Sequence, residues 1–394
     1  MKVGDLLKVT IIDDNHLGNG IAKVNDKTIF VPGTLKDDIV QIKILKLKKD
    51  IVNAEVISFI EKSNHFDVKC PYYGKCGGCN LLHTSYDREK ELKESYIKKL
   101  FGLKCKIISF NREHYRNKVT LHIKNGSLGL YEENTNTLVP IDNCLLLDEN
   151  INQLIAIVKD FDLSNIKEII IKEGKEGLLI STNGSFNNDD LNTLKKHTKS
   201  IYQNNELIYG EEYLTISFDD INYSINHDSF FQINNECAKA LYDKIKEEVG
   251  TCDTLLDLYC GTGSIGIYLN KNVKKITGIE INENSVKCAK KNIKNNNINN
   301  YEIIKTDASC VKGNYDIVIV DPPRSGLSKN VVSILNKMNM KKLIYVSCNP
   351  STLKRDVSLL NSFHIKEASI FNMFPGTSHI ETLMILEKEK FYED

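Results

Sequence analysis

Two runs of strand-forming residues in the C-terminal part of the chain end at residues that could do chemistry. Tyr315–Val320 is followed by the sequence DPPRSG, which begins at Asp321, and Lys342–Val346 is followed by SCNP, which contains Cys348. Enzymes that alternate strands with helices keep their reactive groups at such strand ends. A thiolate can attack a carbon atom, and a carboxylate can bind the edge of a base or a cofactor. We therefore expect Asp321 and Cys348 to serve one site, on a loop that the two prolines stiffen.

The residues after Cys348 favour its reactive form. Asn349-Pro350 and the following sequence STLKRDVSLL predict the beginning of a helix directly after the strand. The positive end of that helix dipole favours a thiolate over a thiol. The alternative is an ordinary buried cysteine, which the surrounding motifs make the weaker interpretation.

A glycine-rich loop lies upstream of these two strand ends. The sequence LLDLYCGTGSIG places Gly261, Gly263 and Gly266 after a strand and at a helix start, and Glu280 ends the next strand. Glycines of this spacing let a cofactor approach the backbone, and an acid at that distance accepts hydrogen bonds from ribose hydroxyls. The loop suits both NAD and S-adenosylmethionine, and a purely structural glycine turn is the third interpretation. Asp321 and Cys348 favour a methyltransferase that acts on a planar base.

Three segments with different residue patterns must position these groups. Residues 1–60 read as five short strands and predict a small β-barrel, whose Lys43, Lys46, Lys48 and Lys49 form either a basic face or a solvated edge. Residues 61–225 predict a β-rich central domain with a helix over 86–101. Residues 226–394 alternate strands with helices, notably 283–296 and 328–339, which predicts a doubly wound α/β domain.

Composition limits the classes of protein to consider. The chain has 394 residues, 41% hydrophobic and 26% charged, with a formal net charge of +0, so an RNA-binding surface must be a local patch. No apolar run is long enough to span a bilayer, and the N-terminal residues lack a signal-peptide layout, so we expect a cytoplasmic protein. The 11 cysteines then favour a metal cluster, a reactive thiol and buried residues over disulfides.

Four of these cysteines suggest a metal cluster. The sequence CPYYGKCGGC gives the spacing C-x5-C-x2-C for Cys70, Cys76 and Cys79, and Cys144 lies far downstream. Four thiolates hold either a [4Fe–4S] cluster or a structural zinc ion. The spacing alone leaves both open.

The ordered motifs together resemble one known family. SFFQIN (229–234), DLYCGTG (257–263), DPPRSG (321–326), SCNP (347–350) and HIET (379–382) resemble those of the RNA uracil-5-methyltransferases. Residues 18–40 resemble the TRAM domain, an OB-type RNA-binding β-barrel at the N-terminus of many members, and the family resemblance covers essentially the whole chain. It implies a C-terminal Rossmann-like domain that uses S-adenosylmethionine, and an RNA substrate that is 23S ribosomal RNA or transfer RNA. The barrel and the cysteine segment favour 23S ribosomal RNA.

The resemblance also implies roles for single residues. Cys348 matches the family's nucleophile, and Glu381 matches its general base, although Glu381 alone would read as an acid at a strand edge. The implied cofactor-binding residues are Gln232, Tyr259, Gly261, Ser264, Glu280, Asp307 and Asp321, of which Ser264 and Asp307 stand where some members carry amides. The resemblance favours an iron–sulfur cluster over zinc, with Cys144 as its fourth ligand.

These roles make chemical sense for uracil. Attack of the Cys348 thiolate on C6 would create an enolate with electron density at C5, which can then take a methyl group from a sulfonium. Glu381 would remove the remaining proton from C5 so that the thiolate can leave. The base must be unstacked to be reached, so we expect a flipped nucleotide or a loop.

Competing functions make different demands on the same residues. A methyltransferase acting on an exocyclic amine would not need Cys348, and a nicotinamide oxidoreductase rests only on the glycine loop. An RNA-binding protein with an inactive cofactor domain would not need Cys348 and Glu381 together. Arg324 either meets a phosphate or pairs with an acid. We expect a monomer without an obligate protein partner.

Overall fold

The computed structural model describes residues 1–388 and divides into two compact units. The first unit contains Met1–Gly102, Leu130–Ile141 and Phe374–His379. The second contains Leu103–Gly129, Asp142–Met373 and, among the described residues, 380–388. The chain therefore passes between the units several times, and each unit is described by itself. No helix within residues 1–388 is long and apolar enough to cross a membrane.

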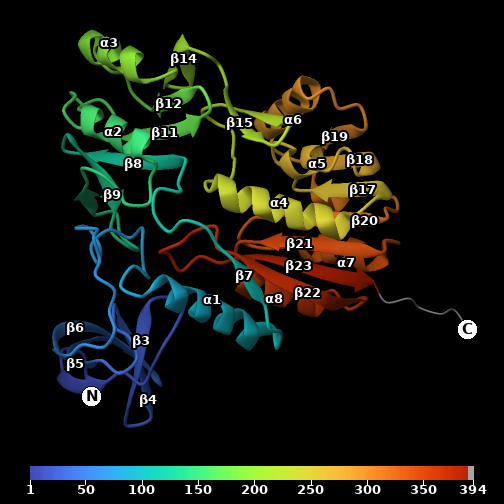
Figure 1. The fold of residues 1–394 in the computed structure, drawn as a ribbon. Helices are drawn as coiled ribbons and strands as arrows, with labels where there is room; N and C mark the ends of the chain where they lie inside the picture. Colours follow the sequence, from blue (N-terminus) through green and yellow to red (C-terminus); the bar gives the residue numbers. More distant parts are fainter. Residues whose placement is uncertain (389–394) are drawn as a thin grey trace, which may run out of the picture. The chain divides into compact units, whose positions relative to one another are not determined.

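The N-terminal part of the first unit is a six-stranded sheet with the order β1-β5-β6-β4-β3-β2 (blue in Figure 1). The strands are β1 (Leu6–Thr10), β2 (Asp13–Asp14), β3 (Asn19–Val24), β4 (Lys27–Pro32), β5 (Ile39–Lys48) and β6 (Ile51–Glu61). Alternate side chains such as Val40, Ile42 and Ile44 are fully buried, as the alternating sequence predicts. The sixth strand arises because residues 6–14 form two strands where the pattern predicted one. Lys43 and Lys46 are on β5, and Lys43 pairs with Glu55 at 3.7 Å.

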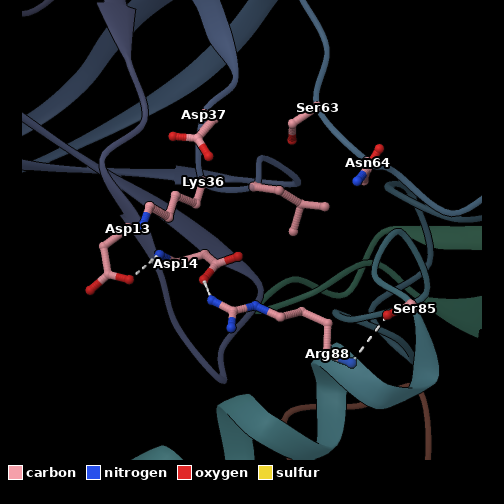
Figure 2. Close-up of a pocket in the computed structure, with 9 residues that line it drawn as sticks. Asp13, Asp14, Lys36, Asp37, Ser63, Asn64, Ser85 and Arg88 are labelled. Carbon is pink, nitrogen blue, oxygen red and sulfur yellow. Dashed lines mark hydrogen bonds and ion pairs between the residues drawn. The ribbon is translucent and has the colours of Figure 1, made fainter.

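Helix α1 (Tyr86–Phe101) follows the cysteine segment in the same unit and has the predicted bounds. The Ser85 hydroxyl accepts a hydrogen bond from the Arg88 N–H at 3.1 Å, which caps the first turn. The Arg88 guanidinium also pairs with Asp14 of β2 and thereby ties the helix to the barrel. Figure 2 shows both contacts at the edge of a cavity of about 360 Å³ lined by polar residues of the barrel and the helix.

A second sheet lies largely in the second unit, where its strands follow the order β9-β8-β11-β12-β13-β14. These strands are β8 (Lys118–Lys124), β9 (Ser127–Tyr131), β11 (Glu168–Gly174), β12 (Gly177–Thr182), β13 (Ser200–Gln203) and β14 (Glu206–Gly210); β10 (Leu138–Pro140) falls in the first unit. The sheet is accompanied by α2 (Glu149–Val158), α3 (Asn188–His197) and the hairpin of β15 (Leu214–Phe218) and β16 (Ile221–Ile225). The predicted β-rich character of this region is confirmed.

The rest of the second unit is built on an eight-stranded sheet with the order β19-β18-β17-β20-β21-β23-β22-β7. Figure 1 shows the strands β18, β17, β20, β21, β23 and β22 one below another in this order. Its strands are β7 (Lys106–Ile108), β17 (Cys252–Leu258), β18 (Val273–Glu280), β19 (Tyr301–Lys305), β20 (Ile317–Val320), β21 (Lys342–Ser347), β22 (Phe363–Phe371) and β23 (Glu381–Lys388). The helices are α4 (Asn235–Val249), α5 (Ser264–Tyr268), α6 (Glu283–Asn295), α7 (Lys329–Lys337) and α8 (Pro350–Leu359), with a 3₁₀ turn at Ala308–Cys310. The predicted doubly wound α/β domain is confirmed, and β7 is an addition to it.

Candidate active site

The residues predicted to form the site lie at one edge of the eight-stranded sheet. Strands β17, β18, β19, β20 and β21 run parallel, so their C-terminal ends share that edge. The residues at or just after these ends are Tyr259, Glu280, Asp307, Asp321 and Cys348. Strand β17 has β18 on one side and β20 on the other, so the direction in which strands are added to the sheet reverses at β17. Such a switch point is where open α/β sheets bind their ligands.

The glycine-rich loop between β17 and α5 has room for a cofactor. Gly261 and Gly263 have φ of 54° and 76°, a region that favours glycine. A Cβ atom on Gly261 would meet no atom within 4 Å, so the space beside it is open. Gly263, the N-cap of helix α5, has no side chain to cap the first turn, in which the Gly266 N–H donates to the Asp257 carboxylate at 3.2 Å. These features fit S-adenosylmethionine.

Glu280 fixes the shape of that loop in addition to facing it. Its carboxylate accepts hydrogen bonds from the N–H groups of Gly261 at 3.0 Å, Ile281 at 2.9 Å and Asn282 at 2.7 Å. The sequence predicted only a contact with ribose. Ser264 is also engaged within the protein, because its hydroxyl accepts a hydrogen bond from Tyr242 at 2.9 Å.

Asp307 and Gln232 are the two predicted cofactor-binding residues that lie outside the loop and Glu280, and they stand on different segments. Asp307 is exposed after β19, and its negative charge, after burial, helps raise the pKa of Tyr259 to about 12. The Tyr259 phenol therefore keeps its proton near neutral pH and can donate a hydrogen bond. Gln232 lies in the segment between β16 and α4 and is partly buried. Its side-chain amide has no hydrogen-bond partner among the described residues, whereas its backbone carbonyl accepts a bond from Asn117 at 3.0 Å.

Cys348 and Glu381 come together through strand pairing. Strand β23 runs antiparallel to β21, and the pairing places Ser347 opposite Thr382. Cys348 directly follows Ser347, and Glu381 directly precedes Thr382. Because the strands are antiparallel, Cys348 and Glu381 therefore stand opposite each other, one step beyond this pair. Glu381 is only 3% exposed, because β23 lies between β21 and β22. The interpretation of Glu381 as an exposed edge acid is therefore wrong.

Burial, together with neighbouring charges, raises the pKa values of three acidic groups at this edge of the sheet. Burial, followed by the neighbouring Glu381 and Asp321, raises the pKa of the Cys348 thiol to about 11, while Arg324 opposes the rise. Burial and Asp321 also raise the pKa of Glu381 well above its ordinary value. Burial, with the charge of Asp257 added, raises the pKa of Asp321 to about 7. Burial and the neighbouring carboxyls therefore act on the Cys348 thiol in the direction opposite to the predicted effect of the helix dipole.

Backbone contacts hold the loop after β20 against helix α8. The Arg324 carbonyl accepts hydrogen bonds from the Asn349 amide at 3.1 Å and the Thr352 hydroxyl at 3.2 Å. Arg355 donates to the Ser325 carbonyl at 2.8 Å. The segments that carry Asp321 and Cys348 are therefore fastened to each other, as a site built from two loops requires.

Asp257 is a site-supporting residue that the sequence reasoning missed. It is 1% exposed, and its Oδ2 accepts hydrogen bonds from Tyr301 at 2.8 Å and from the Gly266 N–H at 3.2 Å. Burial raises the pKa of Asp257 to about 6. An acid inside the apolar run TLLDLYC was the available signal, since a buried strand seldom carries one without a function.

The predicted iron–sulfur cluster is not supported. Cys70, Cys76 and Cys79 lie in the first unit and Cys144 in the second. Across residues 1–388, no group of three or more His, Cys, Asp or Glu side chains is arranged to hold a metal ion. No step of the chemistry is assigned to a metal.

Comparison with known proteins agrees with this geometry. The family profile described as tRNA (Uracil-5-)-methyltransferase matches residues 188–315 and 311–389, and the TRAM domain profile matches residues 1–57. An uncharacterised RNA methyltransferase of Clostridium acetobutylicum is 30% identical over 99% of this chain and 99% of its own length. One from Halalkalibacterium halodurans is 29% identical over 97% of each chain.

A solved structure extends the similarity to the fold. The tRNA (uracil-54, C5)-methyltransferase of Pyrococcus abyssi, in complex with S-adenosyl-L-homocysteine, is 26% identical and superposes with a TM-score of 0.82. The match covers 96% of this chain and 100% of the other. The two ranges matched by the family profile together cover more than half of this protein's 394 residues. The protein therefore belongs to the RNA uracil-5-methyltransferase family and is an S-adenosylmethionine-dependent RNA methyltransferase.

Proposed function

We propose that the protein methylates C5 of a specific uridine in RNA through a covalent adduct between Cys348 and C6 of the base. The observation that carries this proposal is the pairing of β21 with β23, which brings a thiol and a buried carboxyl to the same level at the glycine-loop edge of the sheet. An exocyclic amine could be methylated without either group. The proposed cofactor-binding residues are those predicted from the sequence, namely Gln232, Tyr259, Gly261, Ser264, Glu280, Asp307 and Asp321.

Before the first step, the Cys348 thiol and the Glu381 carboxyl must each lose a proton to solvent, because the pKa values of both groups are raised in the ligand-free protein. Positive charge lowers the pKa of this thiol, as Arg324 already does in the ligand-free protein. When bound, the cofactor supplies a sulfonium and the methyl group to be transferred. The Cys348 thiolate forms a bond to C6, and the electron pair of the C5–C6 double bond passes into the enolate, which makes C5 nucleophilic.

The last step removes the proton that C5 still carries after methylation. Glu381 takes this proton as a carboxylate, the C5–C6 double bond forms again, and the Cys348–C6 bond breaks to return the thiolate. The buried position of Glu381 suits this role, because its raised pKa makes the carboxylate a stronger base. The products are 5-methyluridine and the demethylated cofactor.

We propose 23S ribosomal RNA as the substrate, with transfer RNA as the second candidate. The N-terminal barrel and the cysteine segment favoured 23S ribosomal RNA in the sequence. The solved transfer RNA enzyme of Pyrococcus abyssi favours the alternative, and its match covers 96% of this chain, most of the barrel included. We also retain as a proposal the functional division into an RNA-binding barrel (1–60), a central RNA-binding domain (61–225) and a methyltransferase domain (226–394).

The decisive experiment incubates the protein with labelled S-adenosylmethionine and unmodified 23S or transfer RNA, beside the Cys348→Ala variant. Mass spectrometry of RNA fragments maps the product. We expect 5-methyluridine in 23S RNA and none with Cys348→Ala. If 5-methyluridine is found in transfer RNA alone, the proposed mechanism is supported, and transfer RNA is the substrate in place of 23S ribosomal RNA. Full activity of Cys348→Ala would refute the covalent mechanism.

A further inference from the structure

The segment 226–235 carries Gln232 and runs from the end of β16 to Asn235, the first residue of α4. Phe231, Ile233 and Asn234 are buried, so the segment packs into the protein although residues 226–233 have no strand or helix ladder to satisfy their backbone. Buried backbone carbonyls need hydrogen-bond donors from elsewhere. Lys172 of β11 and Asn117, which directly precedes β8, supply such donors.

Lys172 of β11 is the first of these residues. It is 4% exposed, and its ammonium nitrogen donates to the carbonyls of Asn226 and Ser229, each at 2.7 Å. It forms no ion pair with a carboxylate within the described part of the chain. Burying a cation is costly unless it gains strong partners. Here the partners are two carbonyls of one short segment, so this buried charge serves to shape that segment.

Asn117 is the second residue and holds the other half of the segment. Its side-chain amide donates to the Gln232 carbonyl at 3.0 Å and to the Asn235 side chain at 2.7 Å. Its backbone N–H donates to the Ile233 carbonyl at 3.0 Å, and its carbonyl accepts from the Glu173 N–H at 2.8 Å. Asn117 is 9% exposed, so water does not replace these bonds readily.

The two residues form one structural device. Asn117 directly precedes β8, and the pairing of β8 with β11 places Lys118 opposite Lys172. Lys172 in β11 and Asn117 directly before β8 thus bind the segment on both sides of Phe230. Together they fix the backbone from Asn226 to Asn235, including the carbonyl of Gln232 itself.

We propose that Lys172 and Asn117 are positioning residues, which hold the segment 226–235 in the conformation that lets Gln232 bind S-adenosylmethionine. This inference rests on the proposed function, because the role of Gln232 is part of it. The central sheet would then set cofactor affinity in the neighbouring α/β fold. Neither residue touches the reacting atoms in this account.

The charges around Lys172 make the device sensitive to pH. Burial, followed by the charge of Lys118 from β8, lowers the pKa of Lys172 to about 7, while Asp228 of the segment and Cys288 of α6 oppose the change. His227 lies beside it, and burial, together with the charge of Lys172, lowers the pKa of His227 as well. As pH rises through 7, Lys172 loses its charge and holds the two carbonyls less strongly. Cofactor affinity should fall over the same range.

The test is calorimetric titration of the full-length protein with S-adenosylhomocysteine, which needs no RNA. Lys172→Met and Asn117→Ala should each raise the dissociation constant about tenfold or more, because each removes two side-chain hydrogen bonds to the segment. Lys172→Arg keeps the charge and donors, and should bind more tightly than Lys172→Met and lose the pH dependence near 7. Lys199→Met, a change of an exposed lysine before β13, should bind as the unchanged protein does.

Thermal melting of each variant shows whether it is folded. If Lys172→Met does not fold, the Asn117→Ala variant and the pH dependence of the unchanged protein still decide. Folded variants with an unaltered dissociation constant would overturn the positioning role. An unchanged protein that binds neither S-adenosylmethionine nor S-adenosylhomocysteine would overturn the proposed function along with it.

Discussion

The pH at which Cys348 becomes reactive tests the charges at the active site most directly. Burial, Glu381 and Asp321 raise the pKa of its thiol from the ordinary 9.0 to about 11. Only the thiolate reacts with iodoacetamide. A difference of two units means that, below about pH 9, the ligand-free protein holds roughly 100-fold less Cys348 thiolate than an ordinary thiol would.

The assay is pulsed alkylation over a series of pH values, followed by digestion and mass spectrometry of the peptide that contains Cys348. The rate should still rise about tenfold per pH unit between about pH 9 and 10, where an ordinary thiol levels off. Cys310 is exposed and gives a reference peptide from the same sample. The pH dependence, and not the absolute rate, is compared, because access to the two thiols differs.

Changing one neighbouring charge separates the causes. Glu381→Gln removes the second-largest cause, so the midpoint should fall below that of the unchanged protein and stay above 9.0, since burial is the largest cause. A rate that levels off near pH 9 in the unchanged protein would refute the account of burial and carboxyl charge. A midpoint that Glu381→Gln leaves in place would refute the proximity of Glu381 to Cys348.

Three further predictions concern other parts of the molecule. In the presence of substrate RNA, the Glu381→Gln variant should accumulate a covalent protein–RNA adduct, which denaturing gels detect, because the proton at C5 is not removed. Its turnover should fall about 100-fold or more for the same reason. Normal turnover without an adduct would contradict the assignment of Glu381 as the base. Gly266→Ala should cost about 1–3 kcal/mol in urea unfolding, because a Cβ atom there would lie 2.5 Å from the Tyr301 ring, and an unchanged midpoint would argue against this close packing. Lys93→Met should destabilise the first unit by about 3–5 kcal/mol, because it removes the cation at 2.9 Å from the fully buried Glu89 carboxylate, and replacing both residues by apolar ones should restore much of the loss.

The sequence predicted the elements whose signals are local. The helix at 86–101 was found with its predicted bounds, because its capping serine and terminal glycine stand in the sequence. The predicted helix at 283–296 is α6, Glu283–Asn295. Strand β7 was missed, because three residues carry too little pattern and the strand depends on pairing with β22. The barrel gained a strand for a similar reason, since β2 has only two residues.

Long-range pairing and charge lay beyond the sequence. Nothing local to residues 347–382 indicates that β23 inserts between β21 and β22. That antiparallel insertion brings Glu381 to the level of Cys348 and buries it, whereas the chain alone suggested an exposed edge. Burial also opposes the predicted effect of the helix dipole on the thiol, because burial beside two carboxyls raises the pKa of Cys348.

Burial of both groups also suggests how the chemistry stays controlled. In the ligand-free protein, Cys348 holds its proton near neutral pH, so the nucleophile is inactive and less open to oxidation. The raised pKa of Glu381 has the same origin and makes its carboxylate an effective base later in the reaction. Because Asp321 raises the pKa of both groups and Arg324 lowers the pKa of both, one change of charge at this edge of the sheet acts on the nucleophile and the base together. A positively charged cofactor bound at the adjacent glycine loop would therefore prepare the two residues in one event.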